Sequence, residues 1–175
     1  MKPILFSTAM VRKILKGEKT QTRRVIEVRK PYKVGEILWV RETWANKSGF
    51  SNAVHPYLYK ADYPESGIGN AKGFGKWKPS IHMPKAAARL FLEVLSVNKE
   101  QLQDITHEDA EKEGCYCIYE NAIPYQHLKN QSFQSLWDSI YAKRGYSWNS
   151  NPRVYKYTFQ VVDKPQESEG EVKDG

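Results

Sequence analysis

The spacing of apolar residues predicts short strands and helices along the chain. A run over residues 2–6 predicts the first strand, and either Ser7 or Thr8 then caps a helix that Gly17 ends. The apolar positions of this helix recur at helical spacing and are Met10, Val11, Ile14 and Leu15. We therefore expect residues 19–24 to follow directly on a helix end, which fixes their position on the folded frame.

Strands dominate the rest of the pattern. Apolar or alternating runs predict strands over residues 37–44, 57–61, 89–98 and 153–162, the third after a short helical turn. One further helix follows Thr106 and ends at Gly114, and another begins at Ser132 and ends at Gly145. The helices do not alternate regularly with the strands, which argues against a doubly wound sheet. We expect an α+β fold that is mainly β, a small closed or nearly closed β-barrel with peripheral helices.

Two segments fall outside this pattern. Residues 45–84 are rich in glycine and proline, and a loop of this length in a compact domain is usually functional or disordered. The cluster Lys76-Trp77-Lys78 near its end favours a contact surface over disorder. Residues 164–175 are polar, acidic and free of aromatic side chains, which predicts a disordered tail. The chain is thus expected to form one domain over 1–163, with 45–84 as a long insertion.

Composition and charge narrow the classes of partner. The net charge of +7 favours a polyanion such as nucleic acid, although positive charge also serves solubility. No segment resembles a signal peptide or a membrane-spanning helix, so we expect a cytoplasmic protein without a membrane partner. Cys115 and Cys117 are too close for an ordinary disulfide or a zinc half-site, which predicts free thiols. No cofactor motif and no metal-ligand spacing is visible, so we expect neither.

The candidate chemistry centres on residues 17–24. A primary amine, hydroxyl groups and two guanidinium groups on one short segment suit a ligand with phosphate or carbonyl groups. A basic, solvated turn is the alternative. The predicted strand over 37–44 begins apolar and ends with Arg41, Glu42 and Trp44, so that it enters either solvent or a pocket.

These segments resemble the ASCH domain, a relative of the PUA RNA-binding fold. The resemblance rests on the motifs Gly17-x-Lys19-Thr20-x-Thr22-Arg23-Arg24 and Lys33-x-Gly35-Glu36-x-x-x-Val40-Arg41-Glu42-x-Trp44. The segments 76–84, 92–94, 102–106, 137–140 and 148–152 look like the phage and prophage branch of that family. Together they cover most of residues 1–162. The resemblance implies a PUA-like β-barrel with a cleft lined by the Lys-Thr-x-Thr segment.

The resemblance also implies a possible reaction. The family's small bacterial amidohydrolases remove the acetyl group from N4-acetylcytidine with a lysine, a threonine and a glutamate. Lys19 and Thr22 match the first two, and Glu113 matches the third at the end of a Thr-x-x-x-Ala-x-x-Glu pattern. Neutral Lys19, its pKa lowered by Arg23 or Arg24, would accept the proton of Thr22 or of water while Glu113 orients the amine. The insertion and the double arginine depart from these enzymes and suggest a larger or more anionic substrate.

Two other interpretations remain open from the sequence. The chain would act as a non-catalytic RNA-binding module if Trp44 and Trp77 stack on bases while nearby cations hold phosphates. It would act as a metal-independent ribonuclease if the lysine, arginines and glutamate supply acid–base chemistry and charge stabilisation. The three candidate catalytic residues also have ordinary structural interpretations: Lys19 as a solvated loop lysine, Thr22 as a strand threonine and Glu113 as a glutamate at a helix end. The expected binding residues are Thr20, Arg23, Arg24, Arg41, Glu42, Trp44, Trp77 and Lys78.

Overall fold

A curved five-stranded sheet forms the centre of the molecule. The computed structural model describes residues 1–28, 30–46, 56–64, 75–115 and 125–166, with the backbone alone for 125–131. The strand order is β1-β3-β6-β7-β2, in which β1 and β3 are parallel and the other pairs are antiparallel. The strands are β1 (Lys2–Leu5), β3 (Ile37–Arg41), β6 (Phe91–Gln101), β7 (Arg153–Val162) and β2 (Gln21–Val25).

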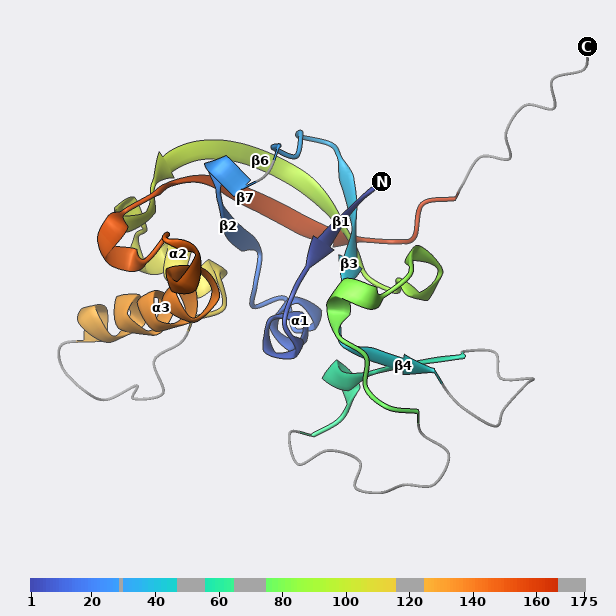
Figure 1. Cartoon of the computed structure of the whole chain (residues 1–175). Coiled ribbons are helices and arrows are strands. Elements are labelled where there is room, and N and C mark those ends of the chain that lie inside the picture. The colour runs from blue at the N-terminus through green and yellow to red at the C-terminus, as the bar shows by residue number, and fades with distance from the viewer. Residues whose placement is uncertain (29, 47–55, 65–74, 116–124, 167–175) are drawn as a thin grey trace, which may run out of the picture.

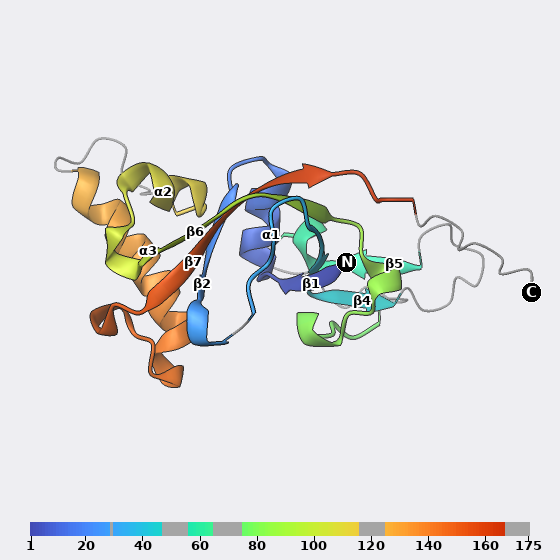
Figure 2. The same ribbon diagram turned by 90° about the horizontal axis from the view of Figure 1, so that it is seen from above.

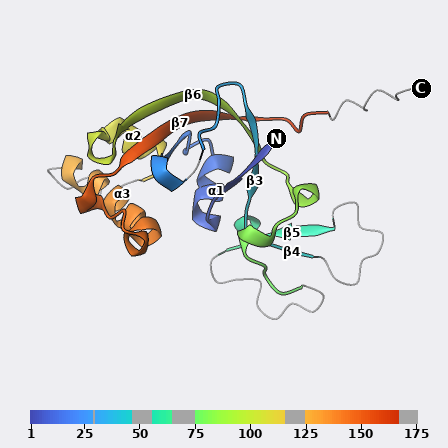
Figure 3. The same ribbon diagram turned by 45° about the horizontal axis from the view of Figure 1, so that its top comes forward.

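The long strands β6 and β7 give the sheet its curvature. They pair from Phe91↔Val162 to Gln101↔Arg153, with a shift in register between Val94 and Ser96. Such an irregularity bends a strand and increases its twist. Figure 1 shows the resulting arch, with α1 (Thr8–Leu15) beneath it, and Figure 3 shows the same placement from another side. Val11 and Ile14 of α1 are buried against the sheet, so that the main core lies under the arch.

Smaller elements lie at the two ends of the sheet. Helices α2 (His107–Lys112) and α3 (Tyr125–Tyr141) gather at one end and share a second apolar core around Phe133 and Trp137. The hairpin of β4 (Trp44–Asn46) and β5 (Tyr57–Tyr59) lies at the other end, as Figure 2 shows. The sheet and the hairpin confirm the expected α+β class with mostly sheet.

The closed barrel is not confirmed. β1 and β2 are the two edges of the sheet, and the described residues contain no pairing between them. Within this part of the chain, no helix is both long and apolar enough to cross a bilayer.

Several predicted boundaries hold and others do not, since the strands predicted over 57–61 and 89–98 are Tyr57–Tyr59 and Phe91–Gln101. The Ser7 hydroxyl accepts from the Met10 N–H at 3.3 Å, Gly17 follows the end of α1 with φ +74°, and β7 has its predicted bounds. The strand predicted over 37–44 is two strands, because the chain leaves the sheet after Arg41 and pairs again as β4. Ser132 is not a cap, since α3 already runs from Tyr125.

The remaining predictions concern the cysteines and the segments with gaps. Cys115 is a buried free thiol, as expected, whereas Cys117 lies outside the described residues. Much of the 45–84 insertion and most of the 164–175 tail also lie outside them.

Candidate functional site

Lys19 is buried in the connection between α1 and β2. Its side chain is 1% exposed, and its ammonium nitrogen lies 2.8 Å from the carbonyl oxygen of Gln21. The same nitrogen is 2.9 Å from the carbonyl oxygen of Glu113 and 2.6 Å from its Oε2. These three acceptors match the three N–H donors of a lysine ammonium. The structure thus brings together Lys19 and Glu113, which are far apart in the sequence.

The end of α2 delivers Glu113 to this position. Glu113 caps the helix, and Gly114 follows in the left-handed region at φ +81°. A Cβ atom at Gly114 would lie 2.7 Å from Cδ of Lys13, so the position needs glycine for space as well as for φ. α1 and the segment after it satisfy the carbonyls at this helix end. Lys13 of α1 donates to Gly114, Lys19 donates to Glu113, and the Thr20 N–H donates to Lys112.

Arg23 extends the contact into a buried ion network. Its guanidinium is 2.7 Å from Glu100, 2.7 Å from Asp109 and 3.2 Å from Glu113. Lys156 of β7 lies 3.0 Å from Glu100 and 3.2 Å from Asp109. Three cations, counting Lys19, thus face three carboxylates. A buried set of charges balanced in this way can lie away from water without a counter-ion.

The surroundings shift the pKa values of three members of the network. Burial would lower the pKa of Lys156, but hydrogen bonds to Glu100 and Asp109 outweigh it and raise this pKa. Burial lowers the pKa of Lys19, an effect that the Glu113 carboxylate opposes and that the charge of Arg24 adds to. Burial would raise the pKa of Asp109, but Arg23 and Lys156 outweigh it and hold this pKa below its ordinary value. Asp109 is therefore ionised at neutral pH. The lowered pKa means that Lys19 gives up its proton more readily than an exposed lysine does.

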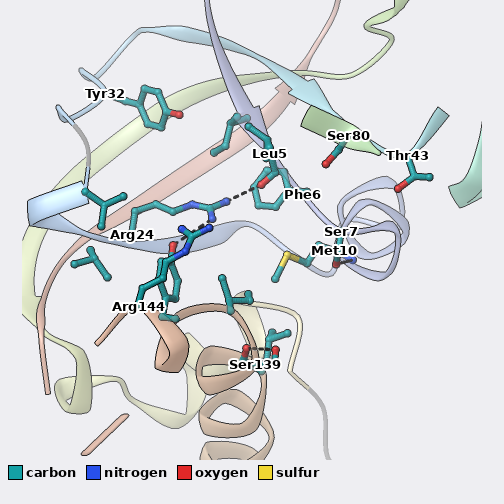
Figure 4. Close-up of a pocket in the computed structure, with 16 residues that line it drawn as sticks. Leu5, Phe6, Ser7, Met10, Arg24, Tyr32, Thr43, Ser80, Ser139 and Arg144 are labelled. Atoms are coloured by element: carbon teal, nitrogen blue, oxygen red, sulfur yellow. Dashed lines mark hydrogen bonds between the residues drawn. The ribbon is translucent and has the colours of Figure 1, made fainter. Parts of the chain in front are cut away.

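A cavity of about 480 Å³ opens beside this network. Figure 4 shows it between β1, the start of α1, β2 and the end of α3. Its volume lies within the range of small-molecule sites, which are largely apolar with a few polar groups. Among the described residues, no carboxylate lines the cavity. Aromatic, aliphatic and hydroxyl side chains line it together with two arginines: Ile4, Leu5, Phe6, Ser7, Met10, Arg24, Val25, Val28, Tyr32, Thr43, Ser80, Leu136, Ser139, Ile140, Tyr141 and Arg144.

Arg24 points into the cavity, whereas its neighbour Arg23 points into the ion network. Successive side chains of a strand point to opposite faces, so that the two arginines of β2 serve different surroundings. Arg24 donates to the carbonyl of Leu5 at 2.9 Å and to the hydroxyl of Tyr141 at 3.4 Å. The Phe6 ring lies 5.3 Å from Cζ of Arg24 and 5.7 Å from Nζ of Lys19, so it stands next to both the cavity and the ion network.

Thr20 and Thr22 lie in the same segment as Lys19. Thr22 is buried in β2 opposite Tyr157, and the Thr20 backbone is held by Lys112. Lys19, Thr22 and Glu113 do not line the cavity, so the expected triad stands behind its wall. The roles of these three residues remain predictions.

The residues expected at the end of the second strand lie apart from Lys19. Glu42 is 1% exposed and forms a two-point ion pair with Arg89 at 2.9 and 3.1 Å. Burial raises the pKa of Glu42, and Arg89 opposes the rise. Arg41 lies over the Trp39 ring and donates to the carbonyl of Ile81. These contacts join β3 to its neighbours.

The two tryptophans proposed for base stacking have different surroundings. Trp44 is 5% exposed, packs against Met83 and Ala87, and has the Lys78 ammonium 4.7 Å from its ring centre. Its ring is therefore covered in this structure. Trp77 is partly exposed beside Tyr63 and lines a second hollow of about 480 Å³ with Lys76, Lys78 and His82 among its walls. That hollow belongs to the hairpin end of the molecule, away from α2 and α3 (Figure 1).

Sequence reasoning missed several cavity residues. In the sequence pattern, Phe6 and Tyr141 have the spacing of ordinary core residues, and Arg144 is a charged residue near the end of a predicted helix. No motif connects them, because the cavity exists only where β1, β2 and α3 meet. Arg24 was an expected binding residue and does line the cavity, but its spacing in the sequence did not identify the residues that surround it there.

Comparisons with known proteins give a likeness in fold. No family model matches the chain, and no curated protein does. A crystal structure of a DUF984 protein from Enterococcus faecalis V583 is similar at a TM-score of 0.51 and 9% identity, over 93% of this chain and 77% of that one. An ASCH domain from Lactobacillus crispatus JV V101 is similar at a TM-score of 0.47 and 14% identity, over 89% and 71%. At such identities, a likeness in structure concerns the fold and leaves the activity open.

Proposed function

We propose that the protein is an ASCH-type protein that binds RNA or a modified nucleoside in the cavity between β1, α1, β2 and α3. The observation that carries this proposal is the composition of the walls, in which the described residues combine aromatic and aliphatic side chains with two guanidinium groups and supply no carboxylate. A base packs on apolar or aromatic faces, and guanidinium groups donate to its carbonyl groups or to phosphates. The motifs around Lys19 and Arg41 support the same interpretation.

A large side chain placed in the cavity should weaken binding. Ser139 is exposed on α3 and lines the cavity, so Ser139→Trp places a large ring in its opening. Ser135 is exposed on the same helix one turn earlier and does not line the cavity, which makes Ser135→Trp the matched control. We expect Ser139→Trp to weaken nucleoside or oligoribonucleotide binding by roughly tenfold or more, which corresponds to about 1.4 kcal/mol. Calorimetric titration measures the affinities. Equal affinities in the two variants would reject the cavity as the binding site.

Hydrolysis of an acylated nucleoside is a second candidate function. The observation in its favour is the contact between Lys19 and Glu113 at 2.6 Å, together with the lowered pKa of Lys19. In this proposal, neutral Lys19, oriented by Glu113, takes a proton from Thr22 or from water, and the oxygen so activated attacks the acyl carbon. The C–N bond then breaks and Lys19 returns the proton to the leaving nitrogen. If Thr22 is the nucleophile, water then hydrolyses the ester and releases the acyl group as a carboxylic acid. Since the pair stands behind the Phe6 ring, the substrate must reach past this side chain.

The hydroxyl of Thr22 provides the test of this second function. Thr22→Val removes the hydroxyl while it keeps the shape of a buried side chain, and Thr158→Val makes the same change in the adjacent strand β7. We expect turnover of N4-acetylcytidine, followed by chromatography, to fall by about 10²- to 10⁴-fold in Thr22→Val only. Absence of turnover in the wild type would remove this substrate. Metal-free cleavage of RNA would then favour a ribonuclease, and binding alone would favour a non-catalytic module.

A further inference from the structure

We propose that Arg24 and Arg144 form a phosphate subsite of the cavity, so that the ligand is a nucleotide or a phosphate-bearing end of RNA and not a neutral nucleoside. This inference rests on the proposed function, since it concerns the same cavity. It goes further because it specifies that the ligand carries negative charge and names the two residues that would bind that charge.

The distribution of carboxylates around the arginines is the first support. Arg23 contacts three carboxylates, and the ion network of which it is part is balanced. Arg24 and Arg144 line a cavity to which none of the described aspartates and glutamates contributes. Two guanidinium groups at one cavity repel each other unless an anion lies between or beside them. The described lining of the cavity is therefore positively charged, which is the sign that attracts phosphate, although the Glu113 carboxylate behind the wall also acts on Arg24.

The donors that remain available are the second support. A guanidinium has five N–H donors in a planar fork that matches phosphate oxygens. Arg24 uses its donors on two neutral oxygens, those of Leu5 and Tyr141, which hold its plane without neutralising its charge. Arg144 is exposed, and the described part of the structure gives it no hydrogen bond or ion pair. Figure 4 shows both side chains directed to the same side of the cavity.

The position of the two arginines suggests how the ligand lies. Arg24 comes from β2, and Arg144 comes from the turn after α3, so the subsite bridges the sheet and the helix. Aromatic and aliphatic side chains, among them Phe6, Tyr32 and Met10, provide apolar wall for a base. The hydroxyl of Ser7 accepts from the Met10 N–H and keeps its own proton for donation to the ligand. A phosphate at the arginines and a base against this wall would occupy one cavity together.

The experiment compares nucleosides with their phosphates. The four standard ribonucleosides, N4-acetylcytidine, and the 5′- and 3′-monophosphates of all five are titrated into the full chain by calorimetry at fixed salt. We expect at least one monophosphate to bind about tenfold or more tightly than its nucleoside, equivalent to about 1.4 kcal/mol. Arg144→Gln should reduce this ratio to below about twofold, because the variant keeps the apolar wall and loses the charge that would bind the phosphate.

Lys143 provides the matched control. It is exposed, adjacent to Arg144, and does not line the cavity, so Lys143→Gln removes the same charge nearby. If both variants lose the preference for the monophosphate over the nucleoside to the same extent, only the general positive field of the protein attracts the phosphate. That result would overturn the subsite. Trinucleotides with and without a 5′-phosphate distinguish the two sources of phosphate. A preference for the phosphorylated trinucleotide over every mononucleotide assigns the subsite to RNA ends, and the reverse order assigns it to free nucleotides.

The failures of the two proposals are distinguishable. If nucleosides and monophosphates bind equally to the wild type, the cavity binds nucleosides and the phosphate subsite is wrong. If no nucleoside, monophosphate or trinucleotide binds, both proposals are wrong.

Discussion

Two adjacent arginines show how the surroundings decide the role of a residue type. Arg23 is 3% exposed and lies among carboxylates, where it neutralises buried charge. Arg24 lies on the opposite face of β2 and meets only neutral acceptors. The first is a structural side chain and the second faces a cavity. The sequence motif treats them as a pair, but the alternation of the strand separates them.

At the residue scale, the pair of Lys19 and Glu113 should contribute strongly to stability. Lys19→Met leaves a buried carboxylate with one fewer cation, and loss of one partner of a buried pair costs about 3–5 kcal/mol. Glu113→Gln removes the negative charge of the same ion pair. We expect the double variant to be less destabilised than the sum of the single variants, by about 0.5–3 kcal/mol. Urea unfolding of the four proteins measures this coupling. Additive effects would show that the two charges do not stabilise each other.

At the element scale, charges attach α2 to the sheet. Asp109 stands in the first turn of α2, where Thr106 caps the helix by accepting from its N–H at 3.1 Å. Its carboxylate reaches Arg23 on β2 and Lys156 on β7. At its other end, the helix is held by Lys13, Lys19 and Thr20. A helix of six residues is too short to be stable by itself, so these contacts must hold it.

The attachment of α2 should depend on pH. The pKa of Asp109 in the folded protein lies below its ordinary value of 3.8, so the unfolded chain takes up the proton first as the pH falls. The stabilisation by Asp109 is complete above that ordinary value and is lost as the pH falls through the lower folded one. We expect the free energy of unfolding to decrease less between about pH 5 and pH 3 in Asp109→Asn than in the wild type. Denaturant unfolding at several pH values measures this, and parallel curves for the two proteins would contradict it.

At the scale of the whole molecule, the cavity lies where distant parts of the chain meet. β1 and α1 come from the first residues, β2 follows them, and Tyr141 and Arg144 come from the end of α3. The arch of β6 and β7 connects this region with the hairpin of β4 and β5 at the far end (Figures 1 and 2). Trp77 and Lys78 belong to that far end. Of the expected binding residues, Arg24 therefore lines the cavity, whereas Trp77 and Lys78 line the second hollow.

The sequence by itself determined the local structure of this protein. Helix caps, glycines after helices and alternating apolar residues are local signals, and they placed α1, α2 and β7 because neighbouring residues alone produce them. The motif around Lys19 also indicated where the chemistry should be sought. The tertiary structure alone decided that Lys19 meets Glu113, that Arg23 and Arg24 face different surroundings, and that Arg144 joins the cavity. Those contacts depend on the curvature of the sheet and on the docking of α2 and α3, which no short stretch of sequence encodes.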